Sequence, residues 1–251
     1  MASTQDINVG VEAYKRGDYE TALREWHPLA EQGEVEAQFI LGLMYGNGEG
    51  VPQDYGEAEK WWRLSAEQGH PGSQNNLGLM YYDGDGVPQD YGEAEKWWRL
   101  SAEQGQAEAQ VSLGWMHYLG KGVLRNYDEA VKWYRLAVEQ GHTEGQNNLG
   151  WMYYHGKGVP QDYGEAEKWW RLAAEQGHAE AQARLGALDF EGEGVPQDYG
   201  EAIKRYQLAA EQGHAETQHM LGFMYKHGEG VPQDYGEALK WFQLAAEQGH
   251  A

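Results

Sequence analysis

Apolar positions follow the period of an α-helix along most of the chain, and the pattern returns every 36 residues. Between residues 34 and 48, Ala37, Leu41 and Tyr45 stand four residues apart, which places them on one face of a helix. Ala58 and Trp62 share this spacing between residues 54 and 68. Each 36-residue segment is therefore predicted to form two amphipathic helices, helix A and then helix B.

Two landmarks define the repeat. The tetrapeptide Ala-Glu-Gln-Gly at residues 30–33 recurs at intervals of 36 residues, and residues 51–64 return letter for letter at 87–100 and 159–172. One helix pair cannot bury both of its apolar faces, so stacked copies should share a continuous core. The prediction is an all-α chain with a single solenoid domain over residues 1–251. It comprises a short first unit at 4–33 and repeats at 34–69, 70–105, 106–141, 142–177, 178–213 and 214–249.

Local signals support the helix boundaries. Asp54 followed by Glu57 has the spacing of a capping box, which starts helix B. Gly69 stands where a helix needs a left-handed residue just beyond its end. Gly42 lies inside helix A and recurs in every repeat, although glycine costs about 1 kcal/mol there relative to alanine. A neighbouring helix is therefore predicted to approach the backbone closely at Gly42.

These residues, together with the Leu-Gly pairs, the Gly-x-Gly turns and the Val-Pro-Gln-Asp-Tyr segments, resemble the Sel-one-like repeat family, which is related to tetratricopeptide repeats. Residues 4–33 look more like a tetratricopeptide unit. The resemblance implies a right-handed α/α superhelical solenoid of helix-turn-helix repeats whose A helices line a concave face. It also implies a protein-binding scaffold or adaptor, often bacterial and often exported to the periplasm.

Three residues depart from the family pattern. His117 and Asp189 replace the tyrosine of helix A, and Arg205 replaces the first aromatic residue of helix B. A buried carboxylate without a partner is costly. Asp189 is therefore predicted to pair with Arg205 or with Arg184, which makes the fifth repeat a structural variant.

Composition narrows the possible functions. The chain has no cysteine, which excludes disulfides and thiolate chemistry. A net charge of −21 argues against nucleic acid and anionic membranes as partners. No apolar run is long enough to span a bilayer. The acidic surface is either a solvated face or one that steers a basic partner toward the protein.

No catalytic, cofactor-binding or metal-binding residue is predicted, and no cofactor. Histidines recur at one position of the repeat, but equivalent positions should stand one repeat apart, too far to share a metal ion. They are His70, His142, His178, His214 and His250. The segment from Asp83 to Gly86 resembles the start of a calcium loop but lacks its terminal glutamate. Tryptophan pairs such as Trp61-Trp62 recur strictly, which favours core packing over ligand stacking.

Asn76 and Asn148 precede Leu-Gly pairs, where a peptide clamp or structural hydrogen bonding is possible, and hydrogen bonding is favoured because no clamp cations accompany them. The predicted protein-binding surface comprises the helix-A positions two and five places after the repeat leucine. These are Leu79, Tyr82, Trp115, Tyr118, Trp151 and Tyr154. The first of the two positions varies between otherwise copied repeats, as a binding surface would. Glu108 and Glu144 flank it. Alternatively, the two tryptophans fill space between adjacent A helices.

The sequence thus favours a non-enzymatic interaction scaffold that binds a protein or peptide on its concave face, with a basic protein or peptide as one candidate partner. The alternative is an acidic inhibitor or immunity-type protein that neutralises a basic secreted enzyme or toxin. A periplasmic or secreted location is expected if a leader was removed, with the cytoplasm as the alternative. The protein is expected to be a monomer or to associate weakly end to end.

Overall fold

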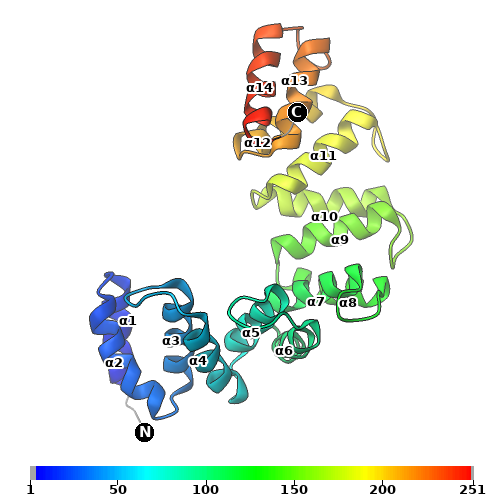
Figure 1. The fold of residues 1–251 in the computed structure, drawn as a ribbon. Helices are drawn as coiled ribbons and strands as arrows, with labels where there is room; N and C mark the ends of the chain where they lie inside the picture. Colours follow the sequence, from blue (N-terminus) through cyan, green and yellow to red (C-terminus); the bar gives the residue numbers. More distant parts are fainter. Residues whose placement is uncertain (1–3, 250–251) are drawn as a thin grey trace. The chain divides into compact units, whose positions relative to one another are not determined.

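The computed structural model describes residues 4–249, and its side chains from residue 8 onward. These residues form fourteen helices and no strand (Figure 1). The helices are α1 (Thr4–Lys15), α2 (Tyr19–Glu31), α3 (Val35–Asn47), α4 (Tyr55–Glu67), α5 (Pro71–Asp83), α6 (Tyr91–Glu103), α7 (Ala107–Leu119), α8 (Tyr127–Glu139), α9 (Thr143–His155), α10 (Tyr163–Glu175), α11 (Ala179–Glu191), α12 (Tyr199–Glu211), α13 (Ala215–His227) and α14 (Tyr235–Glu247).

The chain consists of two compact units, residues 1–126 and residues 127–251. In the first unit each helix from α1 to α7 packs against the next, and in the second unit the same holds from α8 to α14. Within the first unit, α5 also contacts α3 and α7, so successive A helices lie side by side. This succession of packed helix pairs confirms the predicted all-α solenoid class.

The B helices begin as predicted, with one difference. Asp54 Oδ1 accepts hydrogen bonds from the backbone N–H groups of Gly56 at 2.9 Å and Glu57 at 3.1 Å. In a complete capping box the Glu57 side chain would accept the backbone N–H of Asp54. Here the Glu57 carboxylate instead pairs with Lys60 at 2.9 Å. The backbone N–H of Asp54 donates to the carbonyl of Tyr45 at 2.9 Å. That bond closes the loop between the two helices of the repeat.

In most helix pairs the glycine inside helix A makes room for an aromatic ring of helix B. A Cβ atom on Gly42 would lie 2.2 Å from Cδ1 of Trp62, and one on Gly150 would lie 2.6 Å from Cδ1 of Trp170. The predicted close approach therefore occurs, but an indole ring of the same repeat makes it. Trp170 Nε1 is fixed by donating to the carbonyl of Asn147 at 3.0 Å.

The two tryptophans of the Trp61-Trp62 and Trp97-Trp98 pairs have different roles. Trp61 packs into the core of the preceding helix pair with Trp26 and Leu29. Its equivalent, Trp97, likewise joins Trp62 of the preceding repeat. The first ring therefore connects neighbouring repeats, and the second packs on its own helix A. This confirms the predicted packing role of the pairs.

A buried glutamine also joins neighbouring repeats. Gln38 Nε2 donates to the carbonyl of Ala30, near the end of the preceding helix B, at 3.0 Å. Its Oε1 accepts from Gln68 Nε2 of its own repeat at 2.8 Å. Gln74 makes the same two contacts one repeat later, with Ala66 and Gln104. The buried amides are thus satisfied at each of these joints, as burial of polar groups requires.

Candidate functional site

Three equivalent positions on adjacent A helices of the first unit carry apolar side chains. They are Leu43 on α3, Leu79 on α5 and Trp115 on α7. Leu79 is 51% exposed and Trp115 is 42% exposed, so both side chains offer free apolar area. Trp115 stacks on Tyr118 with ring centroids 5.4 Å apart and planes 15° apart. We call Leu43, Leu79, Trp115 and Tyr118 the A-helix surface.

Tyr82 was predicted to share this surface, and its ring is largely engaged within its own helix pair. The ring centroid lies 5.2 Å from that of Tyr91 and 5.3 Å from that of Trp98. The Lys121 ammonium lies 5.1 Å from the Tyr82 ring centre, and its hydrogen bond to Tyr82 raises the pKa of the lysine. The Tyr82 ring is therefore engaged by its own helix pair and by Lys121 of the next repeat.

The remaining two predicted residues, Trp151 and Tyr154, belong to the second unit, where the chain itself covers the indole. The guanidinium of Arg184 lies 4.1 Å from the Trp151 ring centre, a cation–π distance. The His155 ring centroid lies 3.8 Å from that of Trp151. Tyr154 donates its hydroxyl to Glu193, and burial is the main reason that its pKa is raised. Among the predicted surface residues, Leu79 and Trp115 therefore expose more apolar area than Trp151 and Tyr154 do.

Sequence reasoning missed a cavity of about 460 Å³ that adjoins Leu79. Its lining comprises Leu43, Gly46, Asn47, Gln53, Tyr55, Trp62, Asn76, Leu79, Met80 and Asp85. The available signal was Gly46, which occupies the position of Tyr82, Tyr118 and Tyr154 in other repeats. A small residue at an aromatic position leaves space beside the helix.

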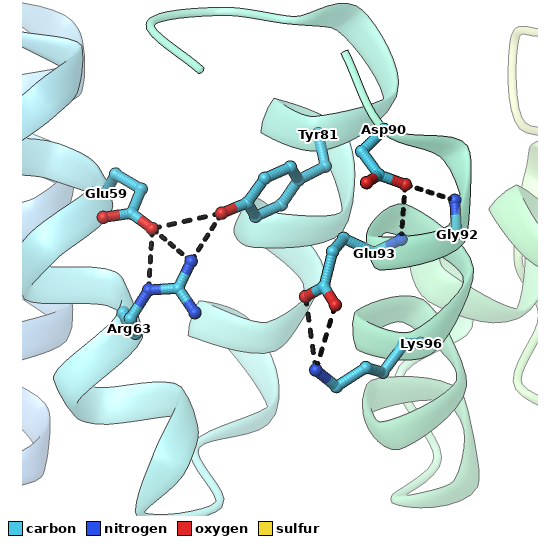
Figure 2. A network of polar contacts seen from close by, with 7 residues as sticks. All are labelled: Glu59, Arg63, Tyr81, Asp90, Gly92, Glu93 and Lys96. Atoms are coloured by element: carbon cyan, nitrogen blue, oxygen red, sulfur yellow. Dashed lines mark hydrogen bonds and ion pairs between the residues drawn. The ribbon is translucent and has the colours of Figure 1, made fainter. Parts of the chain in front are cut away.

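Charged side chains of the B helices α4 and α6 make polar contacts that stabilise the helix pairs (Figure 2). Arg63 on α4 donates from Nε to Glu59 Oε1 at 2.7 Å and also bonds the hydroxyl of Tyr81 on α5. Burial is the largest cause of the raised pKa of Tyr81. Figure 2 also shows Glu93 accepting from Lys96 within α6. Both of these hydrogen bonds are 3.2 Å long. These groups join a repeat to its neighbour or stabilise a helix terminus.

The fifth repeat contains the predicted ion pair. Arg205 Nε lies 2.9 Å from Asp189 Oδ2, which confirms the pairing with Arg205. Arg184 instead pairs with Glu180 at 2.5 Å. Asp189 is only 8% exposed, and burial raises the pKa of its carboxyl against the opposing effect of Arg205. The pair replaces the tyrosine and tryptophan that other repeats place here, in line with a structural variant.

The recurring histidines are helix caps, a role that the sequence analysis did not predict. His70 Nδ1 accepts the backbone N–H of Ser73 at 3.1 Å, and His214 Nδ1 accepts that of Thr217 at 3.3 Å. An accepting Nδ1 carries no proton, so Nε2 is the protonated nitrogen, and that of His214 contacts Glu180 at 2.7 Å. His142 and His178 cap α9 and α11 likewise, whereas His250 lies outside the described residues. No cluster of three or more metal-ligand side chains occurs within the described part of the chain.

Glu180 should make folding sensitive to acid. Its pKa is lowered, first by the hydrogen bond from His214 and further by Arg184 and His178, while burial opposes the shift. A lowered carboxyl pKa stabilises the fold above the ordinary glutamate pKa, and this is lost as pH falls through the lowered value. Glu180→Gln should therefore cost at most about 1 kcal/mol of unfolding free energy near neutral pH, because the side chain is partly exposed, and clearly less at a pH below the ordinary glutamate pKa.

Urea unfolding at the two pH values measures this difference. Glu103→Gln, a change at an exposed glutamate at the end of α6, serves as the control and should show no such loss at either pH. An equal cost of Glu180→Gln at both pH values would contradict the electrostatic explanation.

Helix pairs packed in succession define an α-helical repeat protein. The Sel1 repeat pattern matches residues 35–70, 71–106, 107–142, 143–178, 179–214 and 215–250, one residue later than the predicted boundaries. The chain therefore belongs to the Sel1 repeat family. Sel1 repeat proteins are generally non-catalytic scaffolds that bind other proteins. Across residues 4–249, every helix is too short or too polar to span a bilayer.

Solved structures give the same assignment. A Sel1 repeat protein from Oxalobacter formigenes is 33% identical, with a TM-score of 0.90 and 97% of each chain covered. A protective antigen of uropathogenic Escherichia coli with an SLR fold is 38% identical, with a TM-score of 0.84. It matches 97% of this chain, which spans only 53% of the antigen's length. An immunity protein from Pseudomonas aeruginosa is 18% identical with a TM-score of 0.55, over 85% of this chain and 81% of its own, and shows the fold alone. A comparison with curated proteins found no match.

Proposed function

We propose that this chain is a non-enzymatic scaffold that binds a protein partner on the A-helix surface of its first unit. The observation that carries the proposal is the exposure of Leu79 and Trp115 at equivalent positions on adjacent helices. Neighbouring helix-A residues such as Leu77 and Leu113 are fully buried. Folding therefore does not require large apolar side chains at positions 79 and 115, whereas binding would use them.

The chemistry of the surface suits a protein partner. Tryptophan and tyrosine are enriched at interface hot spots, because they offer large contact areas for little loss of conformational freedom. The stack of Trp115 on Tyr118 holds both rings in a fixed geometry before binding. Pre-organised side chains lose less entropy on association.

The net charge supports a basic partner. The chain carries 40 acidic and 19 basic residues. Several lysines are already paired within their helices, as Lys60 is with Glu57 and Lys96 with Glu93. Potentials of one sign steer partners of the opposite sign and accelerate association. The same observation favours the second candidate, an immunity-type protein that neutralises a basic enzyme.

Trp115→Ala is expected to weaken partner binding by about 2 kcal/mol, roughly thirtyfold, because it removes the largest exposed ring of the surface. The partner is first captured by stoichiometric pull-down from the source organism, and its affinity is then measured by calorimetry. Leu100→Ala is the matched control, since Leu100 is exposed on α6, a B helix, in the same unit.

The helical circular dichroism of Trp115→Ala should stay unchanged, because the side chain is half exposed. If Trp115→Ala binds as tightly as the parent, or if Leu100→Ala is equally weakened, the A-helix surface is not the binding site. A partner enzyme whose activity falls on stoichiometric addition of this protein would select the immunity-type function.

A further inference from the structure

Several helix pairs share an arrangement of three aromatic rings. A tyrosine at the end of helix A lies against the first tyrosine and the second tryptophan of helix B. In the first pair, Tyr14 lies 5.3 Å from Tyr19 and 5.7 Å from Trp26, measured between ring centroids. In the second unit, the Tyr154 ring lies 5.3 Å from Tyr163 and 5.4 Å from Trp170. We call the space that this helix-A ring fills the tyrosine slot.

In the slots of Tyr14 and Tyr154 a carboxylate from the next repeat closes the slot, whereas Lys121 takes the equivalent position beside Tyr82. Tyr14 donates its hydroxyl to Glu49 at 2.5 Å, and Tyr154 donates its own to Glu193. Where helix A carries Phe190, the equivalent carboxylate atom, Glu229 Oε2, is buried without a hydrogen-bond partner. The carboxylate position thus suits a phenolic hydroxyl in particular.

The helix pair formed by α3 and α4 has the slot but no ring of its own to fill it. Gly46 stands at the tyrosine position, whereas Tyr55 and Trp62 are both present. The backbone is unchanged, because Gln53 Nε2 donates to the Gly46 carbonyl at 2.7 Å. The equivalent bond from Gln161 to the Tyr154 carbonyl measures 2.9 Å. Only the side chain is missing.

The missing ring accounts for the cavity beside Leu79. That cavity measures about 460 Å³, and the equivalent cleft lined by Tyr154 and Trp170 measures about 190 Å³. The indole at the back of the larger cavity is less well covered, since Trp62 is 8% exposed and Trp170 is 1% exposed. Asp85, which occupies the position of Glu49 and Glu193 in the repeat, lines the cavity and is exposed.

We infer that this cavity is a binding pocket for a tyrosine side chain of the protein partner, an inference that rests on the proposed function. The partner's ring packs against Trp62 and Tyr55, as the chain's own tyrosines do in the filled slots. Its hydroxyl donates to the Asp85 carboxylate, a charge-assisted hydrogen bond that phenylalanine cannot make. Leu79, which lines both the pocket and the A-helix surface, contacts the residues flanking that tyrosine.

The probe is N-acetyl-L-tyrosinamide, titrated into the full chain with ¹⁵N-labelled indole groups. The Trp62 indole resonance should shift and saturate with a dissociation constant of about 1 mM, because a fragment of this size buries only one ring. N-acetyl-L-phenylalaninamide should bind about tenfold more weakly. Asp85→Asn should bring the two affinities closer, and this exposed change does not threaten folding.

Gly46→Tyr is the decisive variant, because it fills the slot as five of the other helix pairs do with tyrosine or phenylalanine. Its Cβ would lie 3.0 Å from Trp62 Cη2, which asks for only a small movement of the indole. This variant should abolish the Trp62 shift. Unchanged binding by Gly46→Tyr, shifts of Trp98 and Trp170 as large as that of Trp62, or no saturable shift at all would each overturn the pocket.

Trp115→Ala separates this inference from the proposed function. Trp115 does not line the pocket, so the probe should bind this variant normally even where partner binding is lost. Gly46→Tyr could abolish binding of the probe and yet leave the affinity for the partner protein unchanged. That result would overturn the inference that the pocket takes a tyrosine of the partner, and it would leave the A-helix surface as the proposed binding site.

Discussion

Replacing Gly78 by alanine is expected to lower the free energy of unfolding by about 2 to 3 kcal/mol, although alanine is the better helix former. A Cβ atom there would lie 2.4 Å from Trp98 Cδ1, so the indole must move. The movement also breaks the hydrogen bond from Trp98 Nε1 to the Asn75 carbonyl, now 3.1 Å long. Overpacking costs about 1–3 kcal/mol and a buried unpaired donor costs about as much, which together exceed the gain of about 1 kcal/mol in helix propensity.

Urea unfolding together with hydrogen exchange in α5 and α6 measures this loss. Gly92→Ala is the matched control, because its Cβ would meet only Asp90 Oδ1 at 3.3 Å and the third repeat carries Asp128 at this position. In a Trp98→Ala background, Gly78→Ala should become neutral or stabilising, since the ring it displaces is gone. The same loss in both backgrounds would show that the indole is not the cause.

Arg205→Trp is expected to cost about 3 kcal/mol alone, and to become stabilising when Asp189→Tyr accompanies it. The single change leaves the Asp189 carboxylate buried without its cation, and breaking a buried pair costs about 3–5 kcal/mol. The double change restores the residues that the second repeat has at these positions, Tyr81 and Trp97. Replacing a buried ion pair by well-packed apolar groups often stabilises a protein by about 1–4 kcal/mol.

A double-mutant cycle followed by urea unfolding measures the coupling of Asp189 and Arg205. Burial already raises the Asp189 pKa, and a raised carboxyl pKa means that folded protein gains relative stability as pH falls through that value. The cost of Arg205→Trp should therefore shrink in mild acid, which a merely steric defect would not show. If the changes in unfolding free energy of the two single variants simply add up in the double variant, Asp189 and Arg205 are not coupled and the ion-pair explanation is refuted.

The helix pairs could be predicted because their signals are local. The spacing of Ala37 and Leu41 defines a helix face, and Asp54 and Gly69 mark the two ends of helix B. The contact of Gly42 could be expected, but the indole that makes it is twenty residues away, and helix packing decides which atoms meet there.

The missed features have other causes. Histidine is an uncommon helix cap, so composition gave no reason to assign His70 that role. The predicted surface residues share a sequence position, but their exposure depends on local neighbours: Arg184 covers Trp151, whereas Trp115 stays half exposed. The pocket at Gly46 follows from an absent side chain, which becomes visible only when the repeats are aligned with one another.

The buried glutamines at the joints restrict how such a chain can change its length. Gln74 reaches the carbonyl of Ala66 in the preceding helix B and is held by Gln104 of its own, so its position is fixed relative to both helices. Inserting or deleting one residue within either helix would rotate these groups away and leave buried amides unpaired. A whole 36-residue segment carries both halves of the joint with it, and residues 51–64, 87–100 and 159–172 are identical. Evolution by recombination between such copies would therefore add or remove binding surface one complete repeat at a time.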